Sequence, residues 1–261
     1  MFDEYRKIFK INKIFNDLNE KMGYKRYPGD LNLPPTKHKI LTVHAYPEEL
    51  NYPGIRAKNW FNLEIFNLNR NVQMVELNQL LPAEFLANTL DGNFSGKFIY
   101  LSLGSMVSVD VDLMKRLVEI LGKTNHKYIV SKGPRHTEYD LADNMWGDRY
   151  LPQTKLIPHV DLVITHGGNN TVTETFIEAK PMLVLPAFAD QFDNAQRLTE
   201  TGFGAKIDTN NFTSDQLTET INRLLSDEKL KLRLEQAAKR IHATDRHEQL
   251  AQKIEQLLGL E

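Results

Sequence analysis

The 261-residue chain contains no cysteine, which excludes structural disulfides and metal sites that depend on thiolate ligands. No run of about 18 consecutive apolar residues occurs, so no segment has the composition of a membrane-spanning helix. Positive and negative charges nearly balance: the chain has 32 Lys and Arg residues and 34 Asp and Glu residues, a formal net charge of −2. This balance gives no reason to expect a nucleic acid or an acidic membrane surface as a partner.

The N-terminus carries no recognisable targeting signal. Residues 1–21 are charged and amphipathic, and they lack the apolar central region of a secretory signal peptide. Three Asn-x-Ser/Thr triplets begin at Asn93, Asn169 and Asn211, but such triplets often arise by chance. The location stays unknown: the cytoplasm is favoured for this chain, and a membrane-anchored parent protein stays open.

The first third of the chain has little regular pattern. Residues 5–22 place apolar side chains at a helical period, which predicts an amphipathic helix. Residues 39–44 are typical of a short strand, residues 72–77 of a strand or an extended linker, and residues 80–97 of a linker. This part is too short and too irregular for a complete α/β domain of its own.

From residue 98 onward, predicted strands and helices alternate. The predicted strands span residues 98–103, 128–130, 161–165, 182–185 and 205–207, and a long polar stretch without predicted structure runs from the second of them to residue 152. The predicted helices span residues 110–121, 171–179, 193–201, 213–225, 227–241 and 247–258. This alternation predicts the α/β class, with a Rossmann-like, doubly wound parallel sheet.

The stretch from residue 150 to residue 195 has the most informative pattern. An apolar run ends abruptly at Thr165-His166-Gly167-Gly168, and residues that favour the start of a helix follow. A strand, a glycine-containing turn and a helix in this order can bind phosphate, because the backbone approaches closely and the helix N-terminus offers unpaired N–H groups. The pattern therefore predicts a ligand that carries a diphosphate.

The same stretch resembles the donor-binding signature of the UDP-glycosyltransferases, whose GT-B fold has two facing Rossmann-like halves. The resemblance rests on Pro152-Gln153, the THGG turn, Asn170-Thr171, Glu174, Pro186, Asp190-Gln191 and Asn194-Ala195, and it extends from about residue 100 to about residue 225. It implies that residues 95–241 are the nucleotide-sugar-binding domain of the C-terminal half. Residues 1–94 would then be a remnant of the acceptor half with its linker, and residues 242–261 a helix that crosses back.

The resemblance also assigns roles to single residues. Four groups would bind the diphosphate: Ser105, His166, Asn170 and Thr171. The carboxylate of Glu174 would accept from the ribose hydroxyls, Gln153 would lie near uracil and ribose, and Tyr150 would stack on uracil where the family usually has Trp. The pair that would hold the sugar hydroxyls is Asp190 and Gln191.

The implied activity is transfer of a sugar from a UDP-sugar to a hydroxyl of a small lipophilic acceptor, with inversion. UDP-sugar is then a co-substrate, no further cofactor is expected, and no DxD-like metal site is evident. No histidine occupies the context of the family's general base, since His38 and His44 match the last strand of the acceptor half. The catalytic residue is therefore unassigned, and we expect the isolated chain to be poorly active.

Two other functions compete with this interpretation. The chain can instead be a non-catalytic UDP-sugar-binding module, or a donor subunit that needs a separate or missing acceptor half. A Rossmann dehydrogenase is set aside, because no strand leads into a G-x-G-x-x-G turn with an acidic residue after the next strand. Taken singly, Ser105, His166, Glu174 and Asp190 are residues that helix caps and solvated surfaces commonly use, so their assignment depends on the complete pattern.

Overall fold

The computed structural model describes residues 17, 20, 21, 23, 41–54, 59–66, 75–87, 89 and 94–259. The chain forms two compact units, one of Met1–Thr42 with Ala57–Phe61 and one of Val43–Arg56 with Asn62–Glu261. The predicted helix over residues 5–22 lies largely outside the described residues, as do residues 39–40 and 72–74 of the predicted strands. The second unit contains the large sheet and every predicted site residue.

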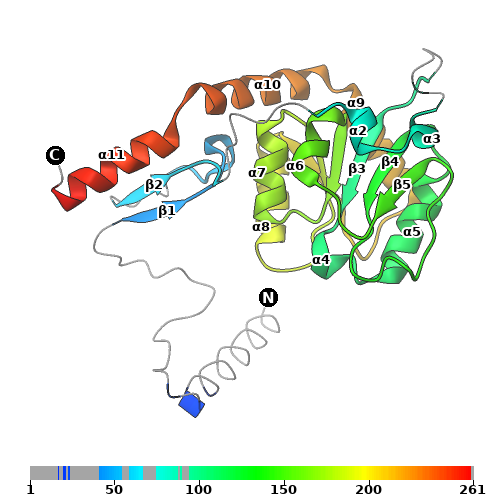
Figure 1. The fold of residues 1–261 in the computed structure, drawn as a ribbon, viewed down its shortest axis with the longest axis horizontal. Helices are drawn as coiled ribbons and strands as arrows, with labels where there is room; N and C mark the ends of the chain where they lie inside the picture. Colours follow the sequence, from blue (N-terminus) through cyan, green and yellow to red (C-terminus); the bar gives the residue numbers. More distant parts are fainter. Residues whose placement is uncertain are drawn as a thin grey trace. The chain divides into compact units, whose positions relative to one another are not determined.

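A six-stranded sheet with the order β5-β4-β3-β6-β7-β8 organises the second unit, and each neighbouring pair is parallel (Figure 1). Its strands are β3 (Phe98–Ser102), β4 (Lys127–Ser131), β5 (Met145–Asp148), β6 (Leu162–Thr165), β7 (Met182–Val184) and β8 (Gly204–Lys206). The apolar runs of the central strands suit a parallel sheet that is covered on both faces. The predicted α/β class and parallel sheet are confirmed.

Helices flank the sheet and connect its strands. They are α4 (Gly104–Val107), α5 (Val111–Leu121), α6 (Gln153–Leu156), α7 (Asn169–Ile177), α8 (Asp190–Glu200) and α9 (Ser214–Ser226), followed by α10 (Glu228–Ala243) and α11 (Arg246–Leu258). Thr213 caps α9, because its hydroxyl accepts from the amide of Gln216 at 3.1 Å. Asp110 caps α5 in the same way, accepting from the amide of Leu113 at 3.0 Å.

The remaining elements of the described chain are short. They are β1 (Thr42–His44), η1 (Glu48–Leu50), β2 (Trp60–Asn62), α2 (Leu77–Leu80), α3 (Ala83–Leu86) and η2 (Ile157–His159). Strands β1 and β2 form a two-stranded sheet of their own. Helices α2 and α3 occupy residues that the sequence predicts as a strand or linker, because four-residue helices are too short to produce a visible period.

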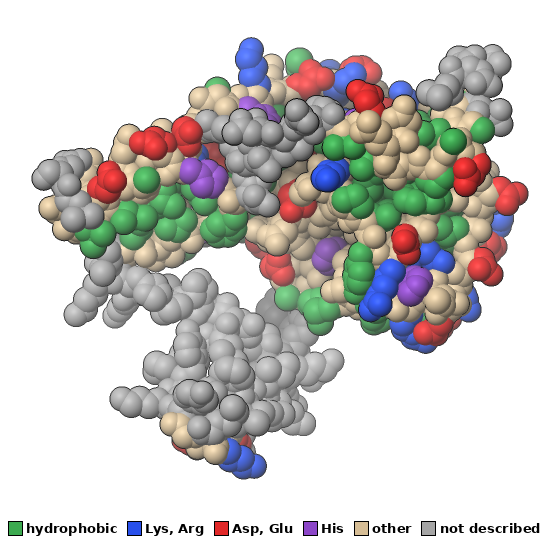
Figure 2. Space-filling model, viewed as in Figure 1, with side chains coloured by type: hydrophobic (Ala, Val, Ile, Leu, Met, Phe, Trp, Pro, Cys, Tyr) green, Lys and Arg blue, Asp and Glu red, His purple; other side chains and the backbone are tan. Residues whose placement is uncertain are grey.

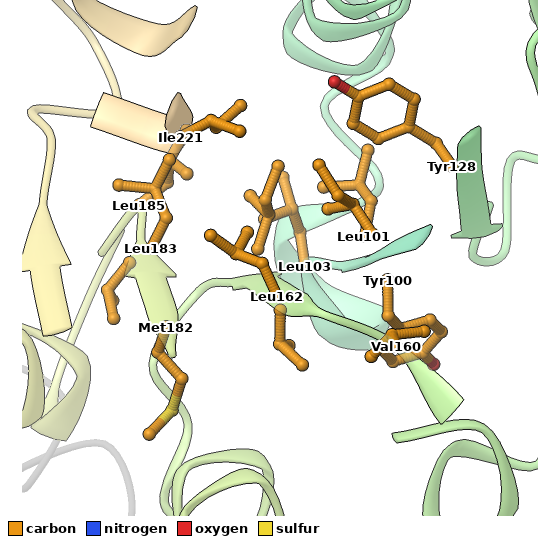
Figure 3. Close-up of a cluster of buried hydrophobic side chains, with 14 of the residues drawn as sticks. Tyr100, Leu101, Leu103, Tyr128, Val160, Leu162, Met182, Leu183, Leu185 and Ile221 are labelled. Carbon is orange, nitrogen blue, oxygen red and sulfur yellow. The ribbon is translucent and has the colours of Figure 1, made fainter. Parts of the chain in front are cut away.

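The hydrophobic core lies between the sheet and its helices. Figure 3 shows side chains from neighbouring strands meeting there, with Leu101 of β3, Leu162 of β6 and Leu183 of β7 all fully buried. Ile221 of α9 packs into the same cluster. Burying one such side chain contributes about 1.5–3 kcal/mol, so this core fixes where the carboxyl ends of the strands meet.

Two differences from the sequence prediction concern the sheet and α8. Strand β5 lies inside the predicted polar loop, and a Cβ on its Gly147 would come within 2.0 Å of the Val130 carbonyl oxygen. A short edge strand with a glycine for close approach has no hydrophobic alternation to detect. Helix α8 begins at Asp190 rather than at residue 193, so Asp190 and Gln191 belong to its first turn. Acidic residues there are favoured by the helix dipole.

Candidate functional site

A cavity of about 370 Å³ opens at the carboxyl ends of the central strands. Residues that follow β3, β6 and β7 line it. The ends of these strands are aligned, because Ser102 pairs with Thr165 and Thr165 pairs with Val184. The cavity is lined by Ser105, Met106, His166, Gly168, Asn169, Asn170, Thr171, Phe188, Asp190 and Gln191. Ligands of open α/β sheets bind at this end of the strands.

The imidazole of His166 fits between two glycines. A Cβ on Gly104 would lie 2.8 Å from the ring's Cε1, and a Cβ on Gly168 would lie 2.6 Å from its Nε2. Burial lowers the pKa of His166 below 6.5, and a hydrogen bond to the backbone of Ser102 and the charge of Asp190 oppose this shift. The ring is therefore neutral at neutral pH when the cavity holds no anion.

The start of α7 forms the floor of the cavity with its backbone amides. The first amides of α7 have no intrahelical partner, as in any α-helix, and Gly168, which precedes them, has no side chain to cap them. The side chain of Asn169 donates instead to the backbone oxygen of Ala45 at 3.2 Å. Asn170 and Thr171 also line the cavity, so amides and a hydroxyl meet where an anion would be bound.

One buried amide connects the two sides of the cavity. Nδ2 of Asn194 donates to the backbone oxygen of Gly167 at 2.8 Å and to Oδ2 of Asp190 at 3.3 Å. Gly167 has a φ of +86°, and a Cβ there would meet Val184 at 2.6 Å. Asn194 therefore holds the turn after β6 against the first turn of α8. The sequence pattern includes Asn194 but assigns it no role.

Asp190 and Gln191 differ in what they offer a ligand. Oε1 of Gln191 accepts from the amides of Ala187 at 2.9 Å and Phe188 at 3.1 Å, which occupies both lone pairs of that oxygen. A ligand can therefore use only the amide nitrogen of Gln191, as a donor. Asp190 lines the cavity with a carboxylate acceptor, directly after Ala189, whose φ of 53° and ψ of −133° turn the chain into α8.

Gln153 and Glu174 adjoin the cavity without lining it. Nε2 of Gln153 donates to Oε2 of Glu174 at 2.6 Å and to the hydroxyl of Thr171 at 3.2 Å. Because Thr171 lines the cavity, a hydrogen bond joins this three-residue cluster to the cavity wall. Both side chains are half-buried, so one face of the cluster stays accessible.

Tyr150, like Gln153 and Glu174, is a predicted site residue that does not line the cavity. Its side chain is 57% exposed, and the guanidinium of Arg149 lies 5.2 Å from the centre of its ring. It follows β5, which is separated from β6 by β4 and β3. An aromatic ring in this position faces solvent until a partner or ligand covers it.

A segment far upstream also contacts the helices of the cavity. Arg197 of α8 donates to the backbone oxygens of Leu50 at 2.8 Å and Asn51 at 3.0 Å, and its guanidinium lies 4.3 Å from the centre of the Tyr52 ring. The hydroxyl of Tyr52 donates to Asp193, and this hydrogen bond raises the pKa of Tyr52 to about 12. We call residues 45–52 the upstream strap, because it is bonded to both α7 and α8.

Residues 81–249 match the family model described as UDP-glucoronosyl and UDP-glucosyl transferase. The chain belongs to this family. Human UDP-glucuronosyltransferase 1A9 is 32% identical over 157 residues, which are 58% of this chain and 29% of that protein. Human UDP-glucuronosyltransferase 3A1 is 29% identical over 165 residues, 61% of this chain and 31% of that protein. The chain thus spans about a third of the length of these relatives.

Solved structures of glycosyltransferases share the fold. The glycotransferase of kitacinnamycin superposes with a TM-score of 0.72 at 22% identity, covering 95% of this chain and 61% of that one. The glycosyltransferase VinC, in complex with DTDP, gives a TM-score of 0.62 at 20% identity and covers 83% of this chain and 52% of that one. The predicted C-terminal half of a GT-B fold is confirmed.

Four lining residues of this chain were not predicted as site residues from its sequence: Met106, Gly168, Asn169 and Phe188. The side chain of Met106 is 66% exposed and that of Phe188 37% exposed. A single apolar residue in a short helix or a loop is indistinguishable in sequence from one that packs inward. The available signal was adjacency in sequence, of Met106 to Ser105 and of Asn169 to Asn170.

Two observations about the described residues complete the site. Within them, no group of three or more His, Asp and Glu side chains is arranged to hold a metal ion. Within them, too, no helix is long and apolar enough to cross a membrane.

Proposed function

We propose that this chain binds the UDP-sugar donor of a glycosyltransferase that transfers the sugar to a hydroxyl of a small lipophilic acceptor, with inversion and without a metal ion. The observation that carries the proposal is that most of the predicted site residues line one cavity. Six of the nine residues predicted from the sequence line it: Ser105, His166, Asn170, Thr171, Asp190 and Gln191. Family membership supplies the reaction class.

Departure of the diphosphate is the step that the described residues support best. Negative charge develops on the leaving phosphate, and donors already in position stabilise it at no cost of reorganisation. The amides that begin α7 provide such donors, together with the hydroxyls of Ser105 and Thr171. His166 adds a ring nitrogen, which becomes a donor when the imidazole is protonated.

Groups beside the cavity and within it suit the other parts of the donor. The Gln153–Glu174 pair suits the ribose, since a carboxylate accepts from both ribose hydroxyls. Tyr150 suits uracil, whose ring would cover the exposed tyrosine side chain on binding. Asp190 as acceptor and Gln191 as donor suit sugar hydroxyls. Met106 and Phe188 give the wall an apolar part that a lipophilic acceptor can contact. We assign no general base.

Calorimetric titration of the full chain with UDP and with UDP-glucose, with and without EDTA, tests the proposal. We expect both ligands to bind, each with the same Kd in the presence of EDTA as in its absence. NAD should not bind. Loss of binding on chelation would remove the metal-free account. Failure of UDP to bind in either condition would contradict the proposed function itself.

A further inference from the structure

The turn between β6 and α7 contains a peptide unit that joins two glycines, Gly167 and Gly168. Because glycine has no Cβ, a peptide unit between two glycines rotates about its flanking bonds with little steric hindrance. In a trans peptide the carbonyl oxygen and the N–H point in opposite directions. Rotation of this unit would therefore put a carbonyl oxygen where an N–H had been.

This exchange matters to an anionic ligand, because Gly168 lines the cavity. An N–H that faces a phosphate oxygen attracts it, whereas a carbonyl oxygen in the same place repels it. Figure 2 shows acidic and basic side chains interspersed over the face that it draws, and the chain has a formal net charge of −2. The orientation of local donors is therefore important for holding a diphosphate.

Asn194 of α8 fixes the orientation of this peptide unit. Its Nδ2 donates to the carbonyl oxygen of Gly167 at 2.8 Å, and Asn194 is only 4% exposed, where such a bond is stronger than in water. A carbonyl oxygen can only accept, so the nitrogen of the amide must face it. The same nitrogen donates to Oδ2 of Asp190 at 3.3 Å, which holds the amide plane in place. The N–H of Gly168 is thereby kept on the side opposite to Asn194.

We propose that Asn194 is a positioning residue for diphosphate binding, and that it acts by holding the N–H of Gly168 toward the ligand. The inference rests on the proposed function, because it concerns how the same cavity binds UDP. Asn194 is outside the ten residues that line the cavity, so it acts through the turn. When the peptide unit can rotate, only molecules in the binding orientation take up UDP, and the apparent affinity falls by their fraction.

Titrations of the full chain with UDP and with uridine test the inference in Asn194→Leu. Leucine has the same branching and the same number of side-chain heavy atoms as asparagine, but it has no donor. UDP should bind this variant about tenfold more weakly than the unaltered chain, because the Gly167 oxygen loses its partner. Uridine, which has no diphosphate, should bind both chains with affinities within about twofold of each other. Nuclear magnetic resonance follows uridine, because it measures weak binding.

A matched control and a second variant accompany Asn194→Leu. Gln196→Leu makes the same change at an exposed amide two positions along α8, and it should leave both affinities unaltered. Asn194→Ala separates the donor from packing, because it leaves a void that a water can enter to bond the Gly167 oxygen. We expect it to lose no more UDP affinity than Asn194→Leu. If circular dichroism shows that Asn194→Leu does not fold, Asn194→Ala carries the test through the same comparison of UDP with uridine.

The outcomes separate this inference from the proposed function. Unchanged UDP affinity in both Asn194 variants would overturn the inference alone, as would equal losses for UDP and uridine, since a general disruption of the site affects both ligands. A larger loss of UDP affinity in Asn194→Ala than in a folded Asn194→Leu would assign Asn194 to packing. Failure of UDP to bind the unaltered chain would contradict the proposed function and the inference with it.

Discussion

At the scale of single residues, His166 occupies space that exists because Gly104 and Gly168 have no side chain. Gly168 has a φ of −62° and a ψ of 140°, a backbone conformation that alanine adopts without strain. Any effect of an alanine there must therefore come from the 2.6 Å contact between its Cβ and the imidazole, or from blocking a ligand's approach to the backbone.

We predict that Gly168→Ala weakens UDP-glucose binding by displacing the ring of His166. Losing a hydrogen bond to a charged group costs about 1.5–3 kcal/mol. Calorimetry of Gly168→Ala, His166→Ala and the double variant measures the coupling. If the ring carries the effect, Gly168→Ala should add little in the His166→Ala background. Fully additive losses would show that the methyl group blocks the backbone instead.

The lowered pKa of His166 predicts a pH dependence. The diphosphate favours the protonated ring, so its binding raises the pKa of His166 and takes up a proton. Affinity for UDP-glucose should therefore increase as the pH falls from above the pKa of the complex, and level off below the pKa of the free protein, which is under 6.5. The slope should not exceed about tenfold per pH unit.

Calorimetry of UDP-glucose from about pH 8 to about pH 5.5 checks this window, which surrounds the ordinary pKa of histidine. UDP-glucose is the right probe, because its diphosphate is a diester and has no phosphate group that titrates near neutral pH. His166→Gln should bind more weakly and show a flat profile. A flat profile in the unaltered chain would mean that the ring binds the donor as a neutral group.

At the scale of elements, the end of α7 has an alanine where glycine is preferred. Ala179 has a φ of 54°, its amide donates to the Phe176 oxygen at 3.1 Å, and the amide of Lys180 donates to the Thr175 oxygen at 3.2 Å. This is the Schellman pattern of a helix C-terminus, whose left-handed position costs an L-residue about 1–2 kcal/mol.

We predict that Ala179→Gly raises the free energy of unfolding by roughly 0.5–1 kcal/mol, the relief of strain less the greater entropy loss of glycine. Urea denaturation followed by circular dichroism measures it. Ala237→Gly, inside α10, is the control of opposite sign, because glycine there weakens a regular helix by about 1 kcal/mol. A loss of stability in Ala179→Gly would show that the methyl group makes contacts worth more than the strain.

Sequence predicts those elements whose signal is local. The cap at Thr213 and the C-terminal glycine at Gly202, which has a φ of +74°, are each set by a few neighbouring residues. Strand β5 and the lone-pair use of Gln191 depend instead on groups brought together by the fold. The cavity-lining positions of Ser105, His166 and Asp190 were predictable because all three follow strands whose carboxyl ends align.

At the scale of the whole second unit, a charge network joins segments that are far apart in sequence. The guanidinium of Arg240 in α10 donates to both oxygens of Glu64 at 2.7 Å and to both oxygens of Glu49 at 2.8 Å. Arg246 adds a contact of 3.3 Å to Glu64, whose side chain is only 1% exposed. Removing Arg240 would leave the Glu64 carboxylate in a desolvated position with fewer partners.

We predict that Arg240→Met destabilises the chain by up to about 3 kcal/mol, because the buried Glu64 carboxylate then loses its two shortest bonds and keeps only the 3.3 Å contact with Arg246. Adding Glu64→Gln in the same chain should recover most of that loss, since the uncompensated charge is gone. Thermal denaturation of the single and double variants measures both effects. Equal stabilities of the two variants would show that Glu64 finds sufficient solvation without Arg240.

The upstream strap has a practical consequence for protein engineering. Its residues are bonded to α7 through Asn169 and to α8 through Arg197, although more than a hundred positions of sequence separate the partners. A chimera that exchanges all of the sequence before β3 would replace these partners and leave Arg197 facing foreign backbone. A crossover placed before residue 43 would carry the strap along with the helices that it holds. Libraries of hybrid transferases built with the earlier junction should contain more folded members than those built with the later one.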